Sequence, residues 1–175
     1  MAANMKTTNR WLRLLKHRRL DDGDAKRLLG GGALERVQAR VAASEALHSG
    51  EIRVCIEAGL PLSYLRSRAT ARDRAVAMFG KLRVWDTAHN NGVLIYLLLA
   101  EHAIEIVADR GLAPHVSVAQ WRAIAQEMEA AFKGGDFEQG LNRAVDAVGA
   151  LLVRHFALAA GEANPNELPD APDVR

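Results

Sequence analysis

The feature that most constrains the fold is an apolar run, Val93–Leu99, which is apolar on both of its faces. Such a run is typical of a central strand that is covered by helices on both sides. Upstream, Glu51–Glu57 alternates between apolar and mainly polar residues, which predicts a half-buried strand. A helical segment separates the two runs, and this arrangement permits a parallel, right-handed crossover.

A third run, Ala103–Asp109, also alternates, and a short turn near Glu101 and His102 separates it from the central run. This spacing predicts a β-hairpin with a two-residue loop, in which Gly92 faces Gly111. The expected fold class is therefore α/β. It has a small central mixed sheet of about three to four strands, built from a parallel crossover and a hairpin, with helices on both faces.

Four helical segments surround these strands in the sequence. Apolar residues at helical spacing begin at Ala33 and end near His48, and three later helices begin at polar residues that have cap spacing. The three expected caps are Thr70 with Asp73, Ser117 with Gln120, and Asp136 with Gln139. We expect residues 1–32 to form a basic N-terminal arm, residues 33–160 the α/β domain, and residues 161–175 an extended, proline-rich tail.

The N-terminal arm combines Trp11 and three leucines with Arg and Lys residues on both sides. One interpretation is a short helix that docks on the domain or frays in solvent. The other is a weak contact with an anionic membrane surface through Trp11 and the flanking Arg and Lys residues. No apolar run reaches the length of a membrane span, and the basic stretch of residues 1–20 lacks the apolar run of a signal peptide, which predicts a cytoplasmic protein.

The composition argues against several classes of function. The net charge is +2, so we expect no nucleic-acid partner. The single cysteine, Cys55, excludes an internal disulfide and a cysteine-based zinc site, and its place in a strand predicts a small buried side chain. Neither Ser44 nor Ser49 has an evident general base, so the sequence offers no candidate for nucleophilic catalysis.

The most unusual segment is a polar loop, residues 86–91, that leads directly into the central strand. The hairpin brings this loop to the same end of the sheet as Asp109 and Arg110. Side-chain oxygens of Asp and Asn residues suit a hard divalent cation such as Ca²⁺ or Mg²⁺, and an arginine suits a phosphate or a carboxylate. The predicted metal ligands are Asp86, Asn90, Asn91 and Asp109, and the predicted ligand-binding residues are Arg110 and His89. The alternative is an ordinary turn beside a surface ion pair.

Four stretches of the chain together resemble the TPM domain family. They are Gly50–Val54, Asn91–Ile95, Ile106–Gly111 and Phe132–Leu141, and the resemblance covers roughly residues 33–158. It implies an α/β sandwich with a small central sheet. It also implies the calcium binding and the acid-phosphatase-like activity described for some members. The chain departs from many relatives after the hairpin, where Asp109-Arg110-Gly111 is followed by Ala113-Pro114-His115.

Three hypotheses about function follow. The first is a binding or accessory module, with a divalent cation as one candidate ligand, whose functional surface is the polar corner formed by the loop and the hairpin end. The second is a metal-assisted phosphatase in which Asp86 and Asp109 hold the cation and Arg110 binds phosphate. The third is a peripheral membrane protein that binds through its basic arm.

Overall fold

The computed structural model describes residues 13–14, 16–19, 23, 27 and 30–175. The helices and strands are α3 (Ala33–Glu45), β1 (Ile52–Glu57), α4 (Leu62–Ser67), α5 (Ala71–Lys81), β2 (Val93–Leu98), the 3-10 turn η1 (Leu99–Glu101), β3 (Ala103–Ala108), the 3-10 turn η2 (Arg110–Leu112), α6 (Val118–Lys133), α7 (Phe137–Phe156) and β4 (Asp173–Val174). The short helix α4 was not predicted. Its neighbour α5 begins at the predicted capping box of Thr70 and Asp73.

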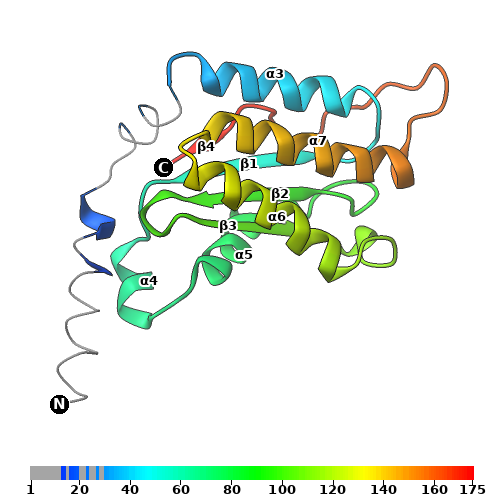
Figure 1. Ribbon diagram of the computed structural model, residues 1–175. Helices are drawn as coiled ribbons and strands as arrows, with labels where there is room; N and C mark the ends of the chain where they lie inside the picture. The colour runs from blue at the N-terminus through cyan, green and yellow to red at the C-terminus, as the bar shows by residue number, and fades with distance from the viewer. Residues whose placement is uncertain (1–12, 15, 20–22, 24–26, 28–29) are drawn as a thin grey trace.

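The four strands form one mixed sheet in the order β3-β2-β1-β4. The parallel pairing of β1 with β2 and the antiparallel pairing of β2 with β3 confirm the predicted crossover and hairpin. Helices α3, α6 and α7 cover one face, and α4 and α5 cover the other (Figure 1). The predicted α/β class is therefore confirmed, including the helices on both faces.

Strand β1 is buried on both faces, so the prediction of a half-buried strand is wrong. Its apolar face packs against α3 and α7, as expected from its alternation. Its polar face is covered partly by α5, whose Arg74 binds Glu57, and partly by the C-terminal tail, which binds Arg53 and Glu51, the residue just before the strand. The guanidinium of Arg53 donates to the backbone oxygens of Pro169 and Ala171, and the carboxylate of Glu51 accepts from the backbone N–H groups of Glu167 and Leu168 at 3.2 Å. Polar residues in β1 thus bind a segment that is more than a hundred positions away.

The hairpin differs in register from the prediction. The turn takes up residues 99–102, which form η1 and a left-handed residue, His102, in place of a two-residue loop. As a result Val93 pairs with Ala108, and the Asp109 N–H donates to the Gly92 carbonyl at 2.9 Å. Gly92 therefore faces Asp109, and the predicted pairing of Gly92 with Gly111 is wrong. The cause is the turn, which takes up four residues where the sequence suggested two.

The predicted caps have different outcomes. Ser117 and Gln120 form a capping box at the start of α6, as Thr70 and Asp73 do at α5. Asp136 occupies the N-cap position of α7, but its side chain makes no cap hydrogen bond, so that prediction is wrong. The backbone of Asp136, with a ψ of 62°, departs from the extended conformation that both capping-box residues adopt.

Part of the N-terminal arm docks on the domain. Residues 13–14 and 16–18 are helical. The side chains of Arg13 and His17 contact the Glu101 carboxylate at 2.7 and 2.9 Å, and His17 Nδ1 accepts from the Leu60 N–H at 2.9 Å. The docked interpretation is therefore confirmed for these residues. Trp11 lies outside the described residues, and the membrane contact stays a prediction. Among the helices that the structure describes, none has the length and apolar character needed to cross a membrane.

Close backbone packing at Gly92 leads to a first prediction. A Cβ atom at this position would lie 2.0 Å from the Val84 carbonyl oxygen, so Gly92→Ala requires the backbone to shift. We expect it to lower the free energy of unfolding by about 2–4 kcal/mol, as for other strained or overpacked substitutions. Chemical denaturation at constant pH measures this change.

Gly80→Ala is the matched control for Gly92→Ala. Gly80 lies within α5 with nothing within 4 Å of its Cβ position, so alanine there should stabilise the helix by about 0.5–1 kcal/mol. Equal effects of the two substitutions would contradict the close approach of Gly92 to Val84.

Candidate functional site

The two polar stretches that were predicted to meet at one end of the sheet do contact each other. The Gly111 N–H donates to the Asn90 carbonyl at 2.9 Å, and Arg110 Nε donates to Asn90 Oδ1 at 3.1 Å. A Cβ atom at Gly111 would lie within 2.6 Å of the carbonyl oxygens of both His89 and Asn90. Glycine is therefore needed at 111 for this contact, and the predicted adjacency is confirmed.

Three of the predicted cation ligands interact with three different partners. Asp86 forms an exposed ion pair with Arg83, and the side-chain oxygen of Asn90 is held by Arg110. Asn91 is fully buried and points elsewhere, with its amide nitrogen 3.2 Å from the Ser49 carbonyl. Within the described part of the chain, no group of three or more His, Cys, Asp and Glu side chains is placed to hold a metal ion. Asp86 and Asn90 are thus engaged with arginine side chains, and the shared cation stays a prediction.

Asp109 is the predicted residue with an unused hydrogen-bonding atom next to a cleft. Its Oδ1 accepts from the Arg110 N–H at 2.7 Å and so caps η2. Its Oδ2 is buried and has no hydrogen-bond partner among the described residues. A buried carboxylate oxygen without a partner is costly, because it has lost its water and gained nothing in return.

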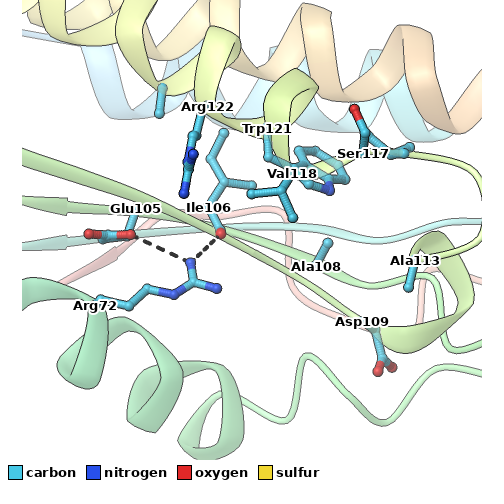
Figure 2. Close-up of a pocket in the computed structure, with 12 residues that line it drawn as sticks. Arg72, Glu105, Ile106, Ala108, Asp109, Ala113, Ser117, Val118, Trp121 and Arg122 are labelled. Atoms are coloured by element: carbon cyan, nitrogen blue, oxygen red, sulfur yellow. Dashed lines mark hydrogen bonds and ion pairs between the residues drawn. The ribbon is translucent and has the colours of Figure 1, made fainter.

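The cleft beside Asp109 has a volume of about 640 Å³. It runs along the outer side of β3, with Arg72 from α5 on one side and the first turns of α6 on the other (Figure 2). The α6 side presents Val118, Trp121 and Arg122. The cleft thus combines an apolar wall with two arginine side chains, and Asp109 lies at one end of it.

Arg72 lines the cleft and contacts β3, the strand at the edge of the sheet. Its Nη1 atom lies 2.5 Å from the Ile106 carbonyl oxygen and 3.5 Å from the Glu105 carboxylate, as the dashed lines in Figure 2 show. Across the cleft, Arg122 is exposed and makes no hydrogen bond or ion pair with any residue that the structure describes. Sequence reasoning missed Arg72, Trp121 and Arg122, because they belong to no motif and only the packing of α5 and α6 beside β3 brings them together.

A serine and a histidine lie together elsewhere, which corrects another prediction. Ser44 Oγ is 3.0 Å from His48 Nε2, and His48 Nδ1 is 3.0 Å from the Gly50 carbonyl. The prediction that Ser44 lacks a nearby base is therefore wrong. His48 lies just beyond the end of α3, and its spacing of four residues from Ser44 was the missed signal. Burial lowers the pKa of His48. A Cβ atom at Gly149 would lie only 2.1 Å from Ser44 Oγ, so the hydroxyl is packed against α7, as expected of a structural contact.

Comparisons with known proteins agree with this architecture. The family model described as the TPM domain matches residues 24–151. The NMR structure of the BA42 protein from the psychrophilic bacterium Bizionia argentinensis is similar, with a TM-score of 0.69 and 28% identity over 81% of this chain and 91% of that chain. The N-terminal domain of a protein from P. gingivalis has a TM-score of 0.61 and 23% identity over 76% and 83% of the two chains, which shows a shared fold. No curated protein matches the chain.

Proposed function

Because the chain belongs to the TPM domain family, we propose that it acts as a binding module whose ligand occupies the cleft between β3 and α6. The single observation that carries this proposal is Arg122, an exposed guanidinium that lines the cleft opposite Arg72 and has no partner among the described residues. A binding site needs polar groups that are placed before the ligand arrives, and an unpaired donor of this kind is such a group.

The chemistry of the cleft favours a ligand with both hydrogen-bond donors and an anionic group. Asp109 Oδ2 accepts hydrogen bonds only, whereas Arg72 and Arg122 are donors that suit a carboxylate or a phosphate. Trp121 and Val118 add apolar surface between these polar ends. A small peptide has all of these features, because it carries N–H donors, a carboxylate and apolar atoms.

A matched pair of variants tests the proposal. We expect triglycine, titrated into the full-length chain at millimolar concentration, to shift the amide NMR signals of β3 and of the first turns of α6. Asp109→Asn should weaken this binding by about tenfold, because it removes a charge-assisted hydrogen bond worth about 1.5–3 kcal/mol. The control, Asp86→Asn, changes an exposed carboxylate that is paired with Arg83 and should leave the binding unchanged.

The same titrations include calcium chloride, magnesium chloride and inorganic phosphate. Signal changes that need both Asp86 and Asp109, and that occur with Ca²⁺ or Mg²⁺ alone, would support the cation that the sequence predicts at the polar corner. If none of the four probes perturbs the cleft, the binding proposal fails. The phosphatase and membrane hypotheses remain predictions, since no contact in the described part of the chain favours either one.

A further inference from the structure

The backbone of β3 has one free side. The sheet order places β3 at an edge, with no strand beyond it in the part of the chain that the structure describes. The Asp109 N–H donates to the Gly92 carbonyl, and in an antiparallel pair every second residue points its backbone N–H and C=O groups at the partner strand. The backbone groups of residues 103, 105 and 107 therefore point toward β2. The N–H and C=O groups of Ile104, Ile106 and Ala108 therefore point away from the sheet. The hydrogen bond from Arg72 to the Ile106 carbonyl agrees with this assignment.

A continuous groove follows this free edge. The cleft beside Asp109 has a neighbour of about 480 Å³, which reaches the other end of the strand at Ala103 and is lined by Gln126 and Glu129 of α6. The two clefts share Glu105, Arg122 and Ala125. The groove is therefore as long as β3 itself, and its walls are the side chain of Arg72 and one face of α6.

The groove matches an extended polypeptide in its backbone and in its side chains. An added strand forms main-chain hydrogen bonds with the free edge, and its alternate side chains face the neighbouring helix. Here that helix offers Trp121 and Val118, of which Val118 is 66% exposed. The positive charge at the middle of the groove comes from Arg72 and Arg122, and the Glu105 carboxylate lies beside Arg72. Arg122 has no partner in the described part of the chain.

Arg72 protects the edge while the groove is empty. An uncovered strand edge pairs readily with other chains, and proteins often protect such edges with charged side chains. The Arg72 guanidinium donates a hydrogen bond to the Ile106 carbonyl at 2.5 Å, and it forms a longer ion pair of 3.5 Å with the Glu105 carboxylate. An acidic side chain on an incoming strand offers Arg72 a stronger, charge-assisted partner. Arg72 can then release the Ile106 carbonyl to that strand.

We propose that this groove binds an extended segment of a partner polypeptide as an additional strand beside β3, with an acidic side chain opposite Arg72 and Arg122. This inference rests on the proposed function and names the class of its ligand. Its central element is the row of outward-facing backbone groups at Ile104, Ile106 and Ala108, which a ligand bound through side chains alone would not use.

The probe is a displayed library of random peptides, selected on the immobilised full-length chain. We expect the enriched peptides to carry an acidic residue flanked by apolar residues at alternate positions. The strongest peptide, labelled with fluorescein, is then titrated by anisotropy. Ala108→Pro, which removes an outward N–H and leaves the ladder to β2 intact, and Arg122→Glu should each weaken binding by about tenfold or more. Arg66→Glu, at an exposed position on α4, should have no effect.

Chemistry on the peptide provides a second test that leaves the protein unchanged. N-methylation of the peptide amides that face β3 should abolish binding, whereas N-methylation of the alternate amides should preserve it. Amide hydrogen exchange of Ile104 and Ala108 in the unmodified chain should slow when the peptide is bound. These two measurements hold even if Ala108→Pro impairs folding.

Three results of these experiments would contradict the added strand. If no peptide is enriched, or if both N-methylation patterns leave the affinity unchanged, strand addition is overturned. Peptides that bind with sensitivity to Arg122→Glu but not to N-methylation would keep the cleft as a binding site and reject the added strand. Enrichment that is equal on the wild type and on Arg122→Glu would place the binding outside the groove and overturn the inference as well.

Discussion

Replacing Arg74 with alanine should lower the free energy of unfolding by about 3–5 kcal/mol, the usual cost of removing one partner from a buried ion pair. Arg74 lies in α5 and donates to both carboxylate oxygens of Glu57 in β1, at 2.5 and 2.9 Å. Glu57 is 3% exposed, and its Oε2 also accepts from the Tyr96 hydroxyl at 2.6 Å. Without Arg74, this buried carboxylate would keep only the tyrosine as a partner.

The pKa shifts of Arg74 and Tyr96 agree with close hydrogen bonds from both residues to Glu57. The hydrogen bonds to Glu57 raise the pKa of Arg74 above its ordinary value. Burial raises the pKa of Tyr96, so its hydroxyl remains a donor to Glu57. Arg74 also lies over the Tyr64 ring, 4.8 Å from its centroid. The arginine thus connects α4, α5 and the two central strands.

Urea denaturation of Arg74→Ala measures this effect. The matched control is Arg66→Ala, an exposed arginine on α4, which should change the stability by less than about 0.5 kcal/mol. The double variant Glu57→Leu with Arg74→Met should recover much of the loss, because an apolar pair leaves no unpaired charge. A loss below about 1 kcal/mol for Arg74→Ala would show that Glu57 is not deeply buried.

A second large effect is expected at Glu45, where stability should fall as the pH rises. Glu45 is 4% exposed, and its Oε1 accepts from the Ile52 N–H at 2.6 Å. Its Oε2 is buried and has no hydrogen-bond partner in the described part of the chain. Burial, with smaller contributions from the nearby Glu51 and Asp170 carboxylates, raises the pKa of Glu45 to about 9.

The sign follows from the two pKa values. The folded chain keeps the Glu45 proton up to about pH 9, whereas the unfolded chain releases it near the ordinary value of 4.5. The contribution of Glu45 to stability is therefore complete below pH 4.5, and it is lost as the pH rises to about 9. The slope over this window is about 1.4 kcal/mol per pH unit. Burial also raises the pKa of Glu51, which acts in the same direction.

Urea denaturation at pH 5, 7 and 9 compares the wild type with Glu45→Gln. Glutamine keeps the acceptor for the Ile52 N–H and cannot ionise, so the variant should show a flatter profile. It should be more stable than the wild type at pH 7 by on the order of 2–3 kcal/mol. Glu127→Gln, which changes an exposed carboxylate on α6, should follow the wild-type profile. Identical slopes for Glu45→Gln and the wild type would rule out a buried, protonated Glu45.

The sequence by itself determined the elements that depend on local patterns. Apolar alternation located β1 and β3, and the doubly apolar run located β2. All three proposed cap residues marked helix starts correctly, and two of them form the capping box. Together with the crossover rule, these patterns were sufficient for the α/β class. They also brought the polar loop at Asn90 to Arg110, because a hairpin fixes which residues share a sheet end.

Only the tertiary structure decided which strand edges are free and what covers each polar face. The polar residues at β1 and just before it appeared to face solvent, yet Glu51 and Arg53 bind the C-terminal tail, whose strand β4 closes one sheet edge. At the other edge, beside Arg72 and Arg122, no strand among the described residues pairs with β3. The physical reason is that periodicity reports the environment within one element, whereas edge position and hydrogen-bond partners depend on contacts between segments far apart in the chain.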